Sequence, residues 1–136
     1  MDLRFSGKVV AVTGLATQDI ETFVLDGSGK AGPATSFPSA DPFPFGIAFG
    51  AGDQLVVANI KDPVNPVIGS VSSYPVSDTG AVTAVDTESS HGGLPCWVAI
   101  TKNGKFIYAV NTGAGEAATV AGFGNASGQL SFLGLS

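Results

Sequence analysis

The chain has 136 residues, of which 44% are hydrophobic and only 12% are charged, and its formal net charge is −5. The length suits one domain with a sizeable core, and an acidic balance without a basic cluster argues against nucleic acid or an anionic membrane as a partner. The single cysteine excludes an internal disulfide. The sequence has neither a run of about 18 apolar residues nor a signal-like N-terminus, so the compartment stays unknown and the cytoplasm is only the default expectation.

Turn-forming residues divide the chain into short segments, because 19 glycines and 8 prolines recur every few residues. No segment shows a helical period, so we expect only strands and turns. The N-terminal part predicts strands over residues 9–13, 20–25 and 34–37, with a turn at 26–29. Nothing before residue 9 matches an inner strand.

Two further groups of strands follow along the chain. The middle part predicts strands over residues 46–49, 55–59, 70–76 and 81–86. The C-terminal part predicts strands over residues 96–101, 106–110, 119–124 and 130–133. The turn at Asn103-Gly104 supports the last group, because both residues tolerate the positive φ of a tight hairpin.

These groups repeat at a spacing of 51 residues. The run Pro44–Phe49 returns as Pro95–Ile100, and without a gap residues 54–58 lie over 105–109. The same spacing lays Gly29 over Gly80. A period of about 50 residues made of short strands predicts β-propeller blades. The predicted fold is therefore all-β, with a partial blade over 1–40 and blades of four antiparallel strands over 41–90 and 91–136.

The predicted blade count is small for a closed ring. A seven-bladed ring at this period would need about 357 residues, far more than this chain has. Both ends of the array are apolar, whereas an open array needs polar caps. We therefore expect a fragment, a truncated gene product or a protomer, with its open blade faces covered by missing blades or by self-association.

The repeat units resemble the seven-bladed lactonase family, which includes bacterial 6-phosphogluconolactonases and fungal carboxymuconate-lactonising enzymes. The stretches that carry this resemblance are residues 19–23, 44–49, 69–74, 80–83 and, most strongly, 94–113. The resemblance covers nearly the whole chain. It implies a hydrolase that opens a sugar-derived lactone such as 6-phosphogluconolactone. The alternative is a non-catalytic propeller segment that acts as a binding or assembly module.

One end of the predicted blades is the expected ligand face. The connection into the first strand of a blade and the connection between its second and third strands open at the same end. A small lactone or sugar-like ligand would bind there, since loops on a rigid scaffold commonly carry function. The polar residues expected at this end, besides Asp19 and Asp41, are Asn59, Lys61, Asp62, Asn111 and Glu116.

The candidate catalytic pair is His91 with Glu88, which the sequence places in a Gly-rich loop. His91 could activate water while a carboxylate orients it. The alternative is that both are solvated loop residues, and the resemblance matches neither to a catalytic motif. Arg4 is the only arginine, so cationic groups that would hold an anionic lactone are scarce.

Cys96 lies on a predicted inner strand, where a buried, unreactive thiol is the favoured interpretation over a nucleophile. The spacing of His91, Cys96 and the nearby acids does not match a zinc site, and no loop has the dense acids of a calcium loop. No cofactor or metal is therefore expected.

Overall fold

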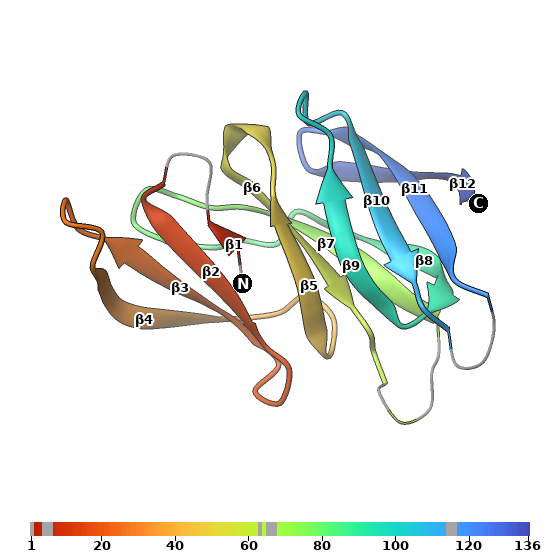
Figure 1. Ribbon diagram of the computed structural model, residues 1–136, viewed down its shortest axis with the longest axis horizontal. Helices are drawn as coiled ribbons and strands as arrows, with labels where there is room; N and C mark the ends of the chain where they lie inside the picture. Colours follow the sequence, from red (N-terminus) through yellow and green to blue (C-terminus); the bar gives the residue numbers. More distant parts are fainter. Residues whose placement is uncertain (1, 4–6, 63, 65–67, 114–116) are drawn as a thin grey trace.

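The computed structural model describes residues 2–3, 7–62, 64, 68–113 and 117–136, and within them the chain forms three antiparallel sheets (Figure 1). Blade 1 contains β1 (Asp2–Leu3), β2 (Val9–Gly14), β3 (Asp19–Leu25) and β4 (Ala31–Pro38). Blade 2 contains β5 (Pro44–Phe49), a short 3-10 turn η1 (Ala51–Asp53), β6 (Gln54–Asn59), β7 (Ile68–Pro75) and β8 (Asp86–Gly93). Blade 3 contains β9 (Pro95–Ile100), β10 (Phe106–Asn111), β11 (Thr119–Ala126) and β12 (Gln129–Leu135).

The strands of each blade pair in chain order, with β1, β5 and β9 as the inner strands. Blade 1 is partial, because β1 contributes only two residues to its inner edge, whereas blades 2 and 3 are complete. The prediction of an all-β chain with two complete blades and a partial one is confirmed. Among the described residues, no helix is long and apolar enough to cross a membrane.

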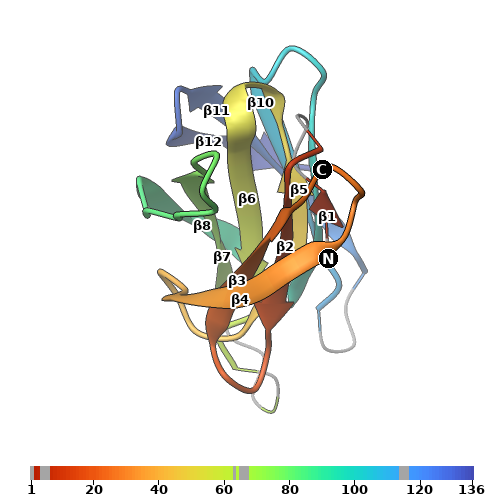
Figure 2. The same ribbon diagram turned by 90° about the vertical axis from the view of Figure 1, so that its left-hand side faces the viewer.

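The three blades stack face to face, as the view with β4 nearest the reader shows (Figure 2). The central strand β6 is buried on both of its faces, and side chains alternate between these faces. Leu55 and Val57 face blade 1, whereas Val56 faces blade 3. One strand therefore joins two separate cores.

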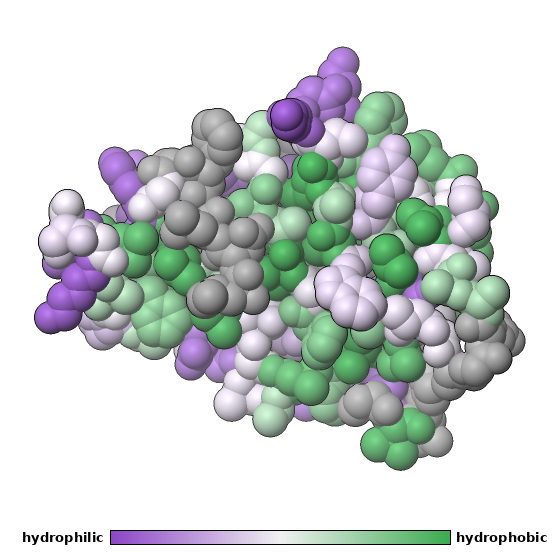
Figure 3. All heavy atoms as spheres, viewed as in Figure 1, coloured by the Kyte–Doolittle hydropathy of each residue, from purple (hydrophilic) through white to green (hydrophobic). Residues whose placement is uncertain are grey.

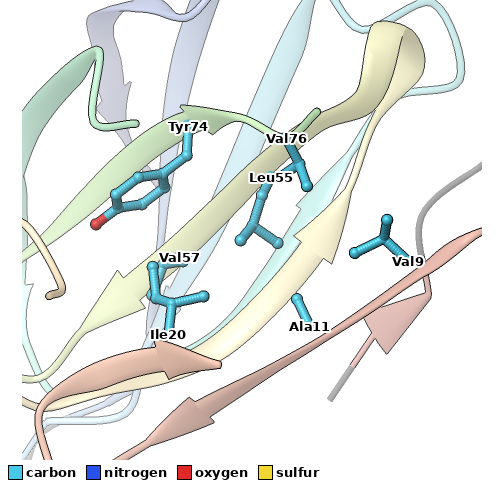
Figure 4. Close-up of a cluster of buried hydrophobic side chains, with 7 residues drawn as sticks. All are labelled: Val9, Ala11, Ile20, Leu55, Val57, Tyr74 and Val76. Atoms are coloured by element: carbon cyan, nitrogen blue, oxygen red, sulfur yellow. The ribbon is translucent and has the colours of Figure 1, made fainter. Parts of the chain in front are cut away.

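The first core lies between blades 1 and 2 (Figure 4). Its buried members are Val9, Ala11, Ile20, Leu55, Val57, Tyr74 and Val76. The second core lies between blades 2 and 3, and its buried members are Val56, Val71, Ile107, Ala109, Ala121, Phe123 and Leu130. Burying apolar area at about 25 cal/mol per Å² makes these two junctions the main source of stability.

The same hydrogen bond reinforces both junctions. Thr22 Oγ1 on β3 donates to the carbonyl oxygen of Gly80, in the turn region after β7, at 2.7 Å. Ser73 Oγ on β7 donates to the carbonyl oxygen of Gly128, in the turn between β11 and β12, at 2.5 Å. We call this bond the blade clasp. In each case a hydroxyl on the third strand of one blade is bound to a glycine carbonyl between the third and fourth strands of the next.

The repeat contains a shift that the gapless alignment missed. Phe49 pairs with Leu55, and Ile100, 51 residues after Phe49, pairs with Ile107. Leu55 is therefore equivalent to Ile107, not to Phe106, and the alignment of residues 54–58 with 105–109 is wrong by one position. The turn after β9 has one residue more than the turn after β5. A shift of one residue exchanges the two faces of a strand.

The outer strand of blade 2 also differs from the prediction. Residues 81–86 were expected to form it, but only Val82 makes an isolated bridge, to Val76, and β8 begins at Asp86. Polar residues dominate β8, so its own sequence gives little strand signal. Pairing with β7 determines its position, since strand formation depends strongly on neighbouring strands.

The inner strands of blades 2 and 3 approach each other closely at Gly46. A Cβ atom at this position would lie 2.2 Å from the carbonyl oxygen of Cys96, which is far inside contact distance. Only glycine fits where two backbones meet in this way. Gly46 thus allows β5 and β9 to lie side by side.

Candidate functional site

The second strands of the three blades all end on one side of the stack. Gly14, Asn59 and Asn111 are the last residues of β2, β6 and β10, and these three strands end at the lower end of Figure 1. The crossing from blade 1 to blade 2, residues 39–43, reaches the same end, because Ile60 N donates to Phe43 O at 3.0 Å. We call this side the loop end.

An ion pair between Asp41 and Lys61 lies at the loop end. Lys61 Nζ is 3.2 Å from Asp41 Oδ2, and the two side chains are 36% and 23% exposed. Asp41 belongs to the crossing between blades, whereas Lys61 follows β6 with a positive φ of 59°. Within the described residues both contacts of the Asp41 carboxylate use Oδ2.

A buried hydroxyl and amide network supports this pair. Ser70 Oγ donates to Asp41 Oδ2 at 2.5 Å, and Asn59 Nδ2 donates to Ser70 Oγ at 3.2 Å and to Ser72 Oγ at 2.8 Å. Ser39 Oγ donates to Asn59 Oδ1 at 3.2 Å. Asn59, Ser70 and Ser72 are buried, so strands rather than loops determine the position of Asp41.

Asn111 occupies the equivalent position in blade 3. Asn59 pairs with Pro44 and Asn111 with Pro95, which are 51 residues apart. Asn111 Nδ2 donates to Thr119 Oγ1 at 3.2 Å and to the carbonyl oxygen of Ser90 at 3.0 Å. Its Oδ1 atom is buried without a hydrogen-bond partner among the described residues, whereas Oδ1 of Asn59 has Ser39.

Asp19, the first residue of β3, lies at the same end of blade 1 and pairs with Gly14 as Ser70 pairs with Asn59. Thr17 Oγ1 donates to Asp19 Oδ1 at 2.5 Å, and Ser36 Oγ donates to Oδ2. These hydroxyls, that of Ser36 first, lower the pKa of Asp19 below its ordinary value of 3.8. The ionised form of Asp19 is therefore favoured at this end of blade 1.

His91 and Glu88 lie on strand β8, not in the loop that the sequence predicted. The ring of His91 stacks on Phe132 of β12, with ring centroids 3.8 Å apart and planes inclined by 28°. Within the described residues, no hydrogen bond or ion pair joins Glu88 to His91. The structure thus places both on an outer strand without bringing their side chains together, and their acid–base role stays a prediction.

The other predicted residues have varied positions relative to the Asp41–Lys61 ion pair. Asn59 and Asn111 end strands and are buried, rather than lying in loops. Asp62 follows Lys61, and its Oδ1 accepts from the backbone amide of Val64 at 2.8 Å. Glu116 lies outside the described residues. Cys96 is half-buried, with Sγ 3.4 Å from Thr112 Oγ1.

The buried serines were not predicted as part of the site. Ser70, Ser72 and Ser73 lie in a strand that is buried on both faces, and a buried hydroxyl needs a partner. This run of serines inside an otherwise apolar strand was the available signal. Among the described residues, no group of three or more His, Cys, Asp or Glu side chains is arranged to hold a metal ion.

Comparisons with known proteins bear on the fold of this chain. No protein-family model and no curated protein sequence matches the chain. Among solved structures, a periplasmic gluconolactonase of Pseudomonas aeruginosa matches 98% of the chain with a TM-score of 0.78 and 18% identity. A candidate 6-phosphogluconolactonase of Bacteroides uniformis matches 96% with a TM-score of 0.79 and 17% identity. The chain has the fold of part of a lactonase-type propeller.

A protein of unknown function from Desulfotomaculum acetoxidans matches 94% of the chain equally well, with a TM-score of 0.78 and 20% identity. The chain spans 38%, 38% and 37% of the Pseudomonas, Desulfotomaculum and Bacteroides proteins, respectively. At these identities the similarity establishes the fold alone, since one fold hosts many functions.

Proposed function

We propose that the loop end of this lactonase-type propeller segment binds a small lactone or sugar-like ligand through Asp41 and Lys61. The observation that carries the proposal is their 3.2 Å ion pair, which is partly exposed at the loop end. A buried network holds Asp41 in place, so its carboxylate needs little reorganisation when a ligand arrives.

The reaction that we propose for this site is hydrolysis of a sugar-derived lactone. Asp41 Oδ1 would accept a proton from water as the water oxygen adds to the lactone carbonyl carbon. Lys61 Nζ would donate a hydrogen bond to the carbonyl oxygen, where negative charge develops. The tetrahedral adduct then collapses as the ring C–O bond breaks, the ring oxygen takes the proton that Asp41 accepted from water, and an open-chain hydroxy acid leaves. The gluconolactonase among the matched structures supports this choice of substrate class.

An assay of the chain with gluconolactone and 6-phosphogluconolactone tests the reaction. We expect turnover above spontaneous hydrolysis, and we expect Asp41→Asn to lower kcat by about 100-fold or more, the usual effect of removing a general base. Lys102→Met, in the turn at the opposite end, is the matched control and should leave kcat unchanged. His91→Ala in the same assay tests the predicted role of His91. Absence of turnover with every lactone would refute hydrolysis by this chain.

The second candidate is a non-catalytic binding or assembly module. It is favoured by the position of His91, the only histidine of the chain, which stacks on Phe132 of the next outer strand. Under this hypothesis, gluconate or its lactone would perturb NMR signals of Asp41 and Lys61, and no hydrolysis would follow. Binding without turnover therefore selects the module over the enzyme.

A further inference from the structure

The two junctions within the chain repeat one backbone pattern at the loop end. After β6, Ile60 N donates to Phe43 O at 3.0 Å, and after β10, Thr112 N donates to Leu94 O at 3.0 Å. Both acceptors, Phe43 and Leu94, lie in a crossing between blades and have a positive φ, of 54° and 49°. The crossing is therefore joined to the end of the second strand in the same way at both junctions.

The side chains on this shared pattern differ at the positions of the ion pair. Counted from the paired residues at the strand ends, Lys61 is equivalent to Gly113 and Asp41 to Gly92. Lys61 has a φ of 59°, in the left-handed region that favours glycine, and Gly113 has 49°. A Cβ atom at Gly92 would lie 2.4 Å from Nδ2 of Asn111, so the asparagine occupies the space that a side chain would need. Of these two junctions, the one between blades 1 and 2 carries the candidate site.

The core of that junction contains a hydroxyl that the other core lacks. Tyr74 pairs with Leu55 and Phe123 with Ile107, so the two aromatic residues are equivalent, and both are buried. A phenylalanine fills this place between blades 2 and 3, which means that packing alone does not require the hydroxyl of Tyr74. Figure 4 shows this hydroxyl at the edge of the core, pointing away from Leu55 and Val76.

The Tyr74 hydroxyl binds the crossing that carries Asp41. Ala40 N donates to Tyr74 Oη at 2.9 Å, and Ser39 Oγ lies 3.4 Å from the same oxygen. Ser39 Oγ has one hydrogen, which it donates to Asn59 Oδ1, so Tyr74 is the donor to Ser39. Both hydrogen bonds of the tyrosine therefore go to the two residues directly before Asp41.

A continuous chain of hydrogen bonds thus leads from Tyr74 to the carboxylate of Asp41. Its links are Tyr74 Oη to Ser39 Oγ, Ser39 Oγ to Asn59 Oδ1, Asn59 Nδ2 to Ser70 Oγ, and Ser70 Oγ to Asp41 Oδ2. Each hydroxyl accepts one bond and donates the next, so the direction of every link is defined. Apolar residues gather over β5, β9 and β10 on the face drawn in Figure 3, whereas this polar chain comes from inside the blades.

The equivalent chain is interrupted at the junction between blades 2 and 3. Phe123 has no hydroxyl, and Ser90, 51 residues after Ser39, donates to the carbonyl oxygen of Gly92 at 2.8 Å. Oδ1 of Asn111 is left buried without a hydrogen-bond partner in the described part of the chain. Among the described residues, the tyrosine hydroxyl, the complete chain and the ion pair therefore occur at the same junction.

We propose that Tyr74 is a positioning residue whose hydroxyl holds the crossing and, through Ser39, Asn59 and Ser70, orients the Asp41 carboxylate. The inference rests on the proposed function, in which Asp41 is the group that acts on the ligand. Tyr74 is buried and acts through Asp41 rather than by contact with the ligand. A small displacement of a reacting group is costly to the rate, so the hydroxyl contributes to catalysis by fixing where Asp41 lies.

Tyr74→Phe tests the proposal, because it places at this position the residue that blade 3 already has there. We expect kcat for gluconolactone to fall about tenfold and KM to stay nearly unchanged, since the reacting group is displaced while the ligand contacts are kept. Thr22→Val is the control for stability: it removes the blade clasp of the same junction and should leave kcat unchanged. An unchanged kcat in Tyr74→Phe, or an equal fall in Thr22→Val, would overturn the proposal.

A double variant tests whether the effect passes through the chain of hydrogen bonds. Ser39→Ala removes the next link, and we expect it to lower kcat to a similar extent. Tyr74→Phe combined with Ser39→Ala should lose little more than Tyr74→Phe alone, because both changes cut one connection. Losses that multiply to about 100-fold would mean that the two residues act independently, and would overturn the chain.

The NMR signal of the Asp41 carboxyl carbon tests the positioning without any turnover. We expect it to shift in Tyr74→Phe and in Ser39→Ala, and to stay unchanged in Thr22→Val. A wild type that hydrolyses no lactone would refute the proposed reaction, whereas the Asp41 signal would still decide the role of Tyr74. A signal that is the same in wild type and Tyr74→Phe would overturn that role.

Discussion

At the scale of single residues, Asp19 shows how two hydroxyl donors favour the ionised form of a carboxyl group. Its carboxylate accepts hydrogen bonds from Thr17 and Ser36, and these lower its pKa below 3.8. The lowered pKa means that the folded chain binds the proton less tightly than the unfolded chain. Asp19 therefore contributes stability above pH 3.8, and this contribution is lost as the pH falls through the pKa of the folded state.

Removal of the hydrogen bond from Ser36, the larger cause of the lowered pKa, should be visible in the titration of Asp19. We expect Ser36→Ala to raise the pKa of Asp19 towards 3.8 and to lower stability at neutral pH. The difference from the wild type should shrink in acid, where the carboxyl is protonated in both proteins. NMR titration of the side-chain carboxyl carbon measures the pKa, and urea unfolding at several pH values measures the stability. An unchanged pKa would show that the Ser36 hydroxyl does not lower the pKa of Asp19.

The candidate site was only partly predictable from single residues. Strand order predicts which segments meet at the loop end, so Asp41 and Lys61 could be assigned to one region from the sequence. Their pairing and its support by Ser70 could not, because they depend on a contact between the blade crossing and β7. His91 was misplaced for a different reason. A glycine-rich polar run was interpreted as a loop, although pairing with β7 makes it a strand.

At the scale of strands, the blade clasp should contribute measurably to stability. Ser73→Ala removes the donor to Gly128 and leaves a buried carbonyl without its partner. We expect a loss of about 1–2 kcal/mol in the free energy of unfolding, measured by urea denaturation. Ser131→Ala, at an exposed position of β12, should change stability by less than about 0.5 kcal/mol. Equal effects of the two substitutions would show that the clasp is not a stabilising bond.

The strand pattern was predictable where apolar alternation and turn residues agree. The strands of blade 3 and the first three of blade 2 follow this rule, and the structure places them within a few residues of the predicted bounds. The rule failed for β8, where polar residues form the strand while the apolar run before it forms only an isolated bridge. Local pattern cannot identify a strand whose position depends mainly on its partner.

At the scale of the whole molecule, a ligand bound at the loop end should raise thermal stability. Any ligand that binds only the folded state raises the unfolding temperature by mass action. We expect gluconate to raise the melting temperature of the wild type, and that of Asp41→Asn to stay constant. Scanning calorimetry over a series of gluconate concentrations measures both. A melting temperature of the wild type that does not vary with gluconate would argue against a ligand site at the loop end.

The extra residue in the turn after β9 has a consequence for anyone who exchanges blades between propellers. If β10 replaced β6 by the uniform 51-residue spacing, Phe106 and Tyr108 would enter the core in place of Leu55 and Val57, while Ile107 would change sides. The length of the hairpin turn therefore determines the register of the strand after it. Only a graft that moves both together preserves which side chains are inside.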